Sequence, residues 1–131
     1  MRTWVLDTNA LLRILFSPSD LTRLGRAIVE LAQEYMAVLV IPALALVELE
    51  YELRRRKQVA VAFDRVLDDI EAADYLRVEP LGVDQLRAMP RLLHIPEMHD
   101  RIIVAHAVTN DAPLMTCDQV IRDSKVVETV W

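Results

Sequence analysis

The sequence has few of the residues on which several common functional sites depend. Its 131 residues include two glycines, Gly25 and Gly82, which excludes a glycine-rich phosphate loop and a dinucleotide-binding fingerprint. A single cysteine, Cys117, excludes an internal disulfide and any zinc site built on several cysteines, and it is typical of a reducing compartment. No hydrophobic run reaches the roughly 18 residues that a membrane span requires.

Basic residues are also in the minority. The chain has 15 Lys and Arg against 20 Asp and Glu, which gives a formal net charge of −5. Because phosphate backbones favour basic surfaces, this balance at first argues against a nucleic-acid binder. With 53% hydrophobic and 27% charged residues, the composition is that of one folded domain over residues 1–131. The N-terminal segment turns acidic and polar after six residues, unlike a signal peptide, so we expect a cytoplasmic protein.

Short apolar runs alternate with longer segments of helical periodicity. Predicted strands cover residues 3–6, 38–41, 76–78, 114–116 and 126–131, and predicted helices cover residues 10–16, 21–35, 42–57, 59–73, 84–89 and 100–110. Ser19 or Asp20 is expected to cap the second helix, and Pro42 fits the first turn of the third. Strands separated by helices favour right-handed crossovers. We therefore expect a three-layer α/β/α domain with a mainly parallel sheet of four to five strands.

Two carboxylates directly follow predicted strands, which is where ligands bind in an open parallel sheet. Asp7 follows the first strand, and Asp118 follows the strand at residues 114–116. If these strands are neighbours, the two like charges are destabilising unless one group takes a proton or a cation lies between them. Oxygen ligands favour a hard divalent ion, Mg²⁺ or Mn²⁺. The alternative is that each Asp only caps the helix that follows it.

Further carboxylates lie in segments of helical periodicity. Glu48 falls on an apolar helix face beside Tyr51. Glu52 lies one turn further along and Glu50 lies on another side, so periodicity does not choose among the three acids. Asp100 opens the last long predicted helix, where a carboxylate complements the positive end of the helix dipole.

Four segments together resemble the acidic motifs of PIN-domain ribonucleases. Asp7-Thr8-Asn9-Ala10-Leu11-Leu12 after a short strand resembles the first motif, and residues 46–53 (LVELEYEL) resemble the second. Residues 100–107 (DRIIVAHA) resemble the third, and residues 114–118 (LMTCD), with a Thr two residues before the Asp, resemble the fourth. The whole chain is similar to the small toxin ribonucleases of VapBC-type toxin–antitoxin pairs. Each motif alone is weak, whereas four in this order are specific.

The resemblance implies a Mg²⁺- or Mn²⁺-dependent endonuclease that cleaves RNA with a metal-activated water. The metal-binding and catalytic cluster that it implies comprises Asp7, Glu48, Asp100 and Asp118. The residues expected to support this cluster through hydrogen bonds are Thr8, Asn9 and Thr116. The acids expected to have outer or structural roles are Glu50, Glu52, Asp111 and Asp123. The partners implied are an RNA substrate, a cognate antitoxin protein and a second copy of the chain in a homodimer, with no membrane.

Other polar residues have simpler interpretations. Residues 54–57 (RRRK) end a predicted helix, where cations complement the helix dipole, and contact with RNA is the alternative. Arg101 is expected to pair with an acid or to reach a phosphate. His99 is expected at the surface, and His106 in the core or behind the site. Cys117 is expected to pack rather than to react, because no base is positioned near it in the sequence.

Two other functions remain open at this point. One is a non-catalytic α/β interaction module whose acids are helix caps and whose apolar helices bind a partner protein. The other is a receiver-like or phosphatase domain, which ranks last because neither Lys57 nor Lys125 follows a strand as that chemistry requires. The acidic net charge excludes neither of them. It does not exclude a nuclease either, because such an enzyme can hold RNA through metal ions and a few arginines.

Overall fold

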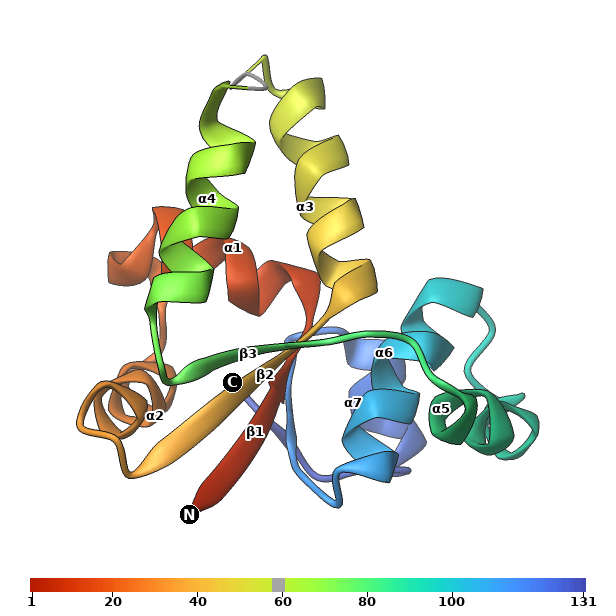
Figure 1. The fold of residues 1–131 in the computed structure, drawn as a ribbon. Helices are drawn as coiled ribbons and strands as arrows, with labels where there is room; N and C mark the ends of the chain where they lie inside the picture. Colours follow the sequence, from red (N-terminus) through yellow and green to blue (C-terminus); the bar gives the residue numbers. More distant parts are fainter. Residues whose placement is uncertain (58–60) are drawn as a thin grey trace.

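A five-stranded parallel sheet forms the centre of the computed structural model, which describes residues 1–57 and 61–131 (Figure 1). The strands are β1 (Arg2–Leu6), β2 (Ala37–Pro42), β3 (Leu76–Glu79), β4 (Leu114–Met115) and β5 (Thr129–Val130). Their order across the sheet is β3-β2-β1-β4-β5, and every neighbouring pair is parallel. β1 is central, since Val5 is in register with Val40 on one side and Leu114 on the other.

Within the described residues, seven α-helices connect the strands and cover the sheet. They are α1 (Thr8–Phe16), α2 (Arg23–Gln33), α3 (Ala43–Arg55), α4 (Val61–Ala72), α5 (Val83–Ala88), α6 (Met98–Thr109) and α7 (Gln119–Ser124), with short 3-10 turns at Pro18–Asp20 and Met89–Leu92. None of the helices in residues 1–57 and 61–131 is long and apolar enough to cross a lipid bilayer.

Side-chain alternation along the strands produces the three layers. In β1, Trp4 and Leu6 belong to the hydrophobic cluster that includes the buried faces of α1 to α4. Val5 points to the opposite face and joins the cluster formed with α5, α6 and α7. Successive side chains of a strand point to opposite faces, so a strand covered on both sides must be apolar throughout. The expected three-layer α/β/α architecture with a parallel sheet is confirmed (Figure 1).

Two helix starts differ from the sequence-based expectation. α2 begins at Arg23 because the Thr22 side chain accepts a hydrogen bond from the Gly25 N–H at 3.0 Å, so neither Ser19 nor Asp20 is its cap. Pro42 is the last residue of β2 and the N-cap of α3, one position before the first turn.

The C-terminal half contains the remaining differences. α6 begins at Met98, two residues earlier than expected, because the Glu97 carboxylate accepts a hydrogen bond from the Asp100 N–H at 2.8 Å. The short helix α7 was not expected, and the last strand, β5, is only two residues long. The helix expected over residues 59–73 begins outside the described residues, and its described part is α4.

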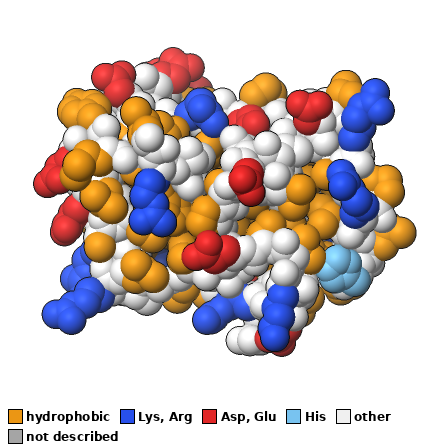
Figure 2. All heavy atoms as spheres, turned by 90° about the horizontal axis from the view of Figure 1, so that it is seen from below, with side chains coloured by type: hydrophobic (Ala, Val, Ile, Leu, Met, Phe, Trp, Pro, Cys, Tyr) orange, Lys and Arg blue, Asp and Glu red, His pale blue; other side chains and the backbone are white. Residues whose placement is uncertain are grey.

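The lower face of the molecule, seen in Figure 2, lies beyond the N-terminal ends of the strands. Acidic, basic and apolar side chains are interspersed over it. The carboxyl ends of β1 and β2 point away from this face, toward α1 and α3 (Figure 1), and β4 runs parallel to β1.

Candidate functional site

The chain order of the strands reverses between β1 and β4. From β1 the chain builds outward through β2 to β3, and it then returns to the other side of β1 to form β4 and β5. A crevice opens beyond the carboxyl ends of the strands at such a switch point. Asp7 directly follows β1, and Asp118 lies three residues after β4. These two strands are neighbours, which is the condition under which the two acids were expected to repel each other, and the Asp7 N–H donates to the Met115 carbonyl at 3.2 Å.

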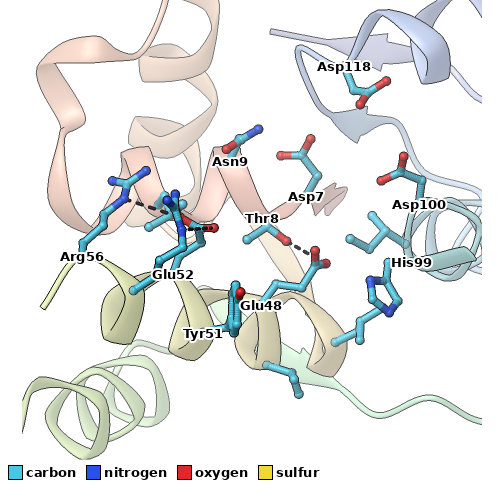
Figure 3. A pocket seen from close by; sticks show the side chains of 15 residues that line it. Asp7, Thr8, Asn9, Glu48, Tyr51, Glu52, Arg56, His99, Asp100 and Asp118 are labelled. Carbon is cyan, nitrogen blue, oxygen red and sulfur yellow. Dashed lines mark hydrogen bonds and ion pairs between the residues drawn. The ribbon is translucent and has the colours of Figure 1, made fainter. Parts of the chain in front are cut away.

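A pocket of about 740 Å³ lies at this position. It is lined by all four expected carboxylates, Asp7, Glu48, Asp100 and Asp118, and by two of the three expected supporting residues, Thr8 and Asn9. The four acids come from different segments of the chain and face the same space (Figure 3).

Asp7 is the most buried of the four acids, with 7% of its surface exposed. It caps α1, since its Oδ1 accepts a hydrogen bond from the Ala10 N–H at 2.8 Å. Burial raises the pKa of this carboxyl above its ordinary value, and the negative charges of Asp118 and Glu48 raise it further. Hydrogen bonds from Thr116 and from Ala10 act in the opposite direction by stabilising the carboxylate.

Thr116, the third expected supporting residue, lies behind the pocket and connects two of the acids. Its hydroxyl is fully buried, bonds Asp7 and accepts a hydrogen bond from the Asp118 N–H at 3.0 Å. Asp118 in turn caps α7 by accepting a hydrogen bond from the Ile121 N–H on Oδ1 at 3.1 Å. The helix-cap interpretation is therefore correct for Asp7 and Asp118, but each cap uses only one carboxylate oxygen.

The structure distinguishes the three acids of α3. Glu48 accepts a hydrogen bond from the Thr8 hydroxyl at 3.1 Å, which fixes its carboxylate in the pocket (Figure 3). Glu50 pairs with Arg54 instead, and Glu52 pairs with Arg55 at 2.9 Å. Glu48 is thus the α3 acid that lies beside the strand-end carboxylates.

Asp100 completes the group from the first turn of α6. Desolvation raises the pKa of this carboxyl to about 6, and the charges of Asp118, Glu97, Glu48 and Asp7 also contribute. Neither Glu48 nor Asp100 caps a helix, because the N-caps of α3 and α6 are Pro42 and Glu97. Helix capping therefore cannot account for the group as a whole.

A family model described as the PIN domain matches residues 4–126. The chain belongs to the PIN-domain family. This match gives no support to the receiver-like alternative. No curated protein matches the sequence.

The solved structures that resemble this PIN domain include three complexes. VapBC2 from Rickettsia felis, bound to a DNA fragment from its promoter, gives a TM-score of 0.77 at 18% identity and covers 98% of each chain. A toxin–antitoxin complex from Klebsiella pneumoniae gives a TM-score of 0.66 at 17% identity, with 97% of this chain and 95% of that chain covered. DNA-bound VapBC from Salmonella typhimurium gives a TM-score of 0.64 at 18% identity, with 99% of this chain and 98% of that chain covered. At these identities the likeness concerns the fold.

Asp111, Asp123 and Arg101 of this PIN domain are not among the described residues that line the pocket. Asp123 is exposed on α7 and accepts a hydrogen bond from Gln119 at 2.6 Å, and Asp111 is exposed in a turn. Arg101 donates to the backbone carbonyls of Ile95 and Pro96, so it holds the loop before α6.

His106, His99 and Cys117 lie in different surroundings, and of these three only His99 lines the pocket. His106 is fully buried, and its Nδ1 lies 3.1 Å from Glu79, as expected for a residue of the core. His99 is at the surface as expected, but it also lines the pocket (Figure 3). Cys117 is a free, partly buried thiol.

Sequence reasoning did not assign the pocket's α3 wall, which includes Val47, Tyr51, Arg55 and Arg56, to the site; it considered RNA contact only as an alternative for residues 54–57. A signal was present, because Tyr51 is three residues after Glu48 and therefore shares its helix face. The signal was ambiguous because an apolar residue on that face is equally typical of a buried core.

The fit of a divalent cation rests on the chemistry of the donors. Four of the five carboxylates that line the pocket, all except the arginine-paired Glu52, form the oxygen-only donor set that Mg²⁺ and Mn²⁺ prefer. Burial raises the pKa values of Asp7 and Asp100 and the neighbouring acids raise them further, so a bound cation would stabilise the charged form of both carboxylates. Within residues 1–57 and 61–131, no three Asp, Glu, His or Cys side chains form a ready-made metal site. The donor set fits a hard cation, but the side chains would have to turn inward to share one.

Proposed function

We propose that this PIN domain is a metal-dependent endoribonuclease that acts as the toxin of a toxin–antitoxin pair. Membership of the PIN-domain family supports nuclease chemistry. The observation that carries the proposal is that Asp7, Glu48, Asp100 and Asp118, from four segments, line one pocket at the switch point of the sheet.

The four carboxylates are the proposed ligands of Mg²⁺ or Mn²⁺. When bound, such an ion lowers the pKa of a coordinated water, orients the phosphodiester and stabilises the leaving oxygen. Burial is the main cause of the raised pKa values of Asp7 and Asp100, and repulsion among the acids adds to it; a bound ion would offset that repulsion. Because metal ions supply the activated water, no Ser, Cys or His nucleophile is required.

The neighbouring side chains would orient the carboxylates. The Thr8 hydroxyl donates to Glu48, so it fixes which oxygen of Glu48 remains for the cation. Thr116 bonds Asp7 and the backbone of Asp118, and it would therefore set the spacing of the acids that follow β1 and β4. Asn9 lines the pocket beside Asp7, where its amide can contact the substrate or a coordinated water (Figure 3).

The toxin assignment is supported by the structures that this fold resembles. Two of them are VapBC complexes and one is a toxin–antitoxin complex. We therefore propose a cognate antitoxin as a protein partner; the homodimer is proposed only from the resemblance of the sequence motifs. Expression of this chain alone should arrest bacterial growth, and co-expression of the antitoxin should restore it.

Glu48 and Glu50 offer a matched test of the proposed chemistry. They lie two residues apart on α3, but Glu48 lines the pocket whereas Glu50 pairs with Arg54. With a mixture of labelled RNAs and Mn²⁺, we expect Glu48→Gln to reduce cleavage at least about a hundredfold, and Glu50→Gln to cleave like the parent. Equal cleavage by the parent and Glu48→Gln would show that the proposed site is wrong.

A further inference from the structure

The wall of the pocket formed by α3 differs in chemistry from the carboxylate end. Tyr51, Glu52, Arg55 and Arg56 line the same pocket as Glu48. Figure 3 shows Arg56 and Glu52 at one end, the strand-end acids at the other, and Tyr51 between them. We call Tyr51, Arg55 and Arg56 the α3 rim.

The two arginines of the α3 rim are held in place by Glu52. Arg55 Nη2 lies 2.9 Å from Glu52 Oε2, and Arg56 Nε lies 3.5 Å from the same oxygen. Both guanidinium side chains remain more than half exposed, at 59% and 54%. A guanidinium has five N–H donors, so each arginine keeps donors for a second acceptor. The pair is therefore a fixed positive charge at the mouth of an otherwise acidic pocket.

Arg54 shows that this arrangement is specific to two of the three consecutive arginines. Arg54 pairs with Glu50, and neither of them is among the described residues that line the pocket. The three arginines have the same chemistry and lie in one turn of helix, but only Arg55 and Arg56 share the space of the carboxylates.

Tyr51 adds an aromatic surface between the two ends of the pocket. Its side chain is 63% exposed, and it lines the pocket next to Val47, which is exposed to the same degree. An exposed aromatic ring beside positive charge is the combination on which proteins stack unpaired bases. A base within a duplex is already stacked on both sides and cannot use this ring.

The length of the α3 rim matches a short stretch of one strand. From Glu48 to Arg56 the helix rises about 12 Å, at 1.5 Å per residue. Over that length a stacked nucleic-acid strand carries roughly three phosphates. A phosphodiester at the carboxylates would therefore place a neighbouring phosphate near the arginines.

We propose that the α3 rim binds an unpaired RNA strand beside the cleavage point, with a base stacked on Tyr51 and the next phosphates bound by Arg55 and Arg56. The inference rests on the proposed function for the identity of the substrate. It adds which side chains hold the strand and that the strand follows α3. An acidic peptide is a poorer occupant, because it has no bases to stack on Tyr51 and would use only the two arginines of the α3 rim.

The test measures RNA binding without cleavage. In the Glu48→Gln background, the Kd of a fluorescein-labelled single-stranded RNA is measured by anisotropy with Mn²⁺ present, for four added changes. We expect R55A/R56A to weaken binding at least about tenfold, with R54A unchanged. We expect Tyr51→Ala to weaken binding at least about fivefold, with Tyr51→Phe unchanged. Annealing the RNA to its complement should weaken binding by the parent background, and R55A/R56A should reduce the salt dependence by about 1.4 in log Kd per log salt.

The possible outcomes separate this inference from the proposed function. Equal Kd values for R54A and R55A/R56A would overturn the inference, whether or not the parent cleaves RNA. Loss of antitoxin binding by R55A/R56A with an unchanged RNA Kd would also overturn it and assign the α3 rim to the protein partner. A parent that fails to cleave RNA, while the α3 rim variants still lose RNA affinity, would contradict the proposed function and support the inference.

Discussion

Replacing Asp100 with Asn should stabilise the metal-free protein at neutral pH. Desolvation and the charges of neighbouring acids raise the pKa of this carboxyl to about 6 from an ordinary value of 3.8. The folded state therefore binds more protons than the unfolded state between these two pH values. The stability contributed by this group falls as pH rises through that interval, and the full penalty is present above pH 6.

The size of the penalty follows from the same interval. At about 1.4 kcal/mol per pH unit, the interval from 3.8 to about 6 corresponds to an upper limit of about 3 kcal/mol. Asp100 is only partly buried, so solvent screening reduces this value. Its position in the first turn of α6 also favours the charge. We therefore expect Asp100→Asn to raise the free energy of unfolding by about 1 kcal/mol at pH 7.

The assay is urea unfolding in the presence of a chelator, at pH 7 and at pH 4.5. Asp84→Asn is the matched control, because Asp84 is exposed in the first turn of α5. The control should not gain stability at either pH, and the gain from Asp100→Asn should shrink by more than half at pH 4.5. A less stable Asp100→Asn protein at pH 7, or a gain that is the same at both pH values, would refute the reasoning.

Two further predictions concern the support and the occupancy of the site. Thr116→Val removes the buried hydroxyl that bonds Asp7 and the Asp118 N–H, and it should cost about 1–3 kcal/mol of unfolding free energy and lower kcat. Urea unfolding and cleavage assays check this, and Thr116→Ser should retain most of both; a fully active, equally stable Thr116→Val would contradict it. Excess Mn²⁺ should raise the Tm of the parent, because a ligand of the folded state stabilises it, and should raise the Tm of Asp118→Asn less. An unchanged parent Tm would argue against a metal site.

The layers of the fold could be predicted from the sequence because they depend on local patterns. The continuous apolar run at β2 and the polar residues after β1 and β4 indicate buried parallel strands with a site at their carboxyl ends. The starts of α2 and α6 could not be predicted. Several adjacent polar residues can cap each helix, and tertiary packing decides which of them does, in these cases Thr22 and Glu97.

The sequence was enough to name the four carboxylates that line the pocket, but not the other residues of the pocket wall. Asp7 and Asp118 follow from their position after strands, and Glu48 and Asp100 were added by the resemblance to PIN domains. The choice of Glu48 over Glu50 and Glu52 depends on contacts with Thr8, Arg54 and Arg55. Helical periodicity alone cannot predict these contacts, because the helix pattern is compatible with each of the three acids facing the site.

The α3 rim shows the same limit for Tyr51, Arg55 and Arg56. The spacing predicts that Tyr51 and Arg55 share a helix face, but not that this face, with Arg56 at the helix end, turns toward the strand-end acids. That orientation is fixed by the buried residues of the opposite face, Leu46, Leu49 and Leu53, which pack into the core.

The most direct test of the central claim is metal-dependent RNA cleavage by the parent and by Asp7→Asn. The parent is treated with a chelator, and cleavage of labelled single-stranded RNA is followed before and after excess Mn²⁺ is restored. We predict no cleavage with the chelator, recovery with Mn²⁺ for the parent, and no recovery for Asp7→Asn, although it folds. Cleavage by Asp7→Asn at the parent rate, or by the parent in the continued presence of the chelator, would contradict a carboxylate site that acts through metal ions.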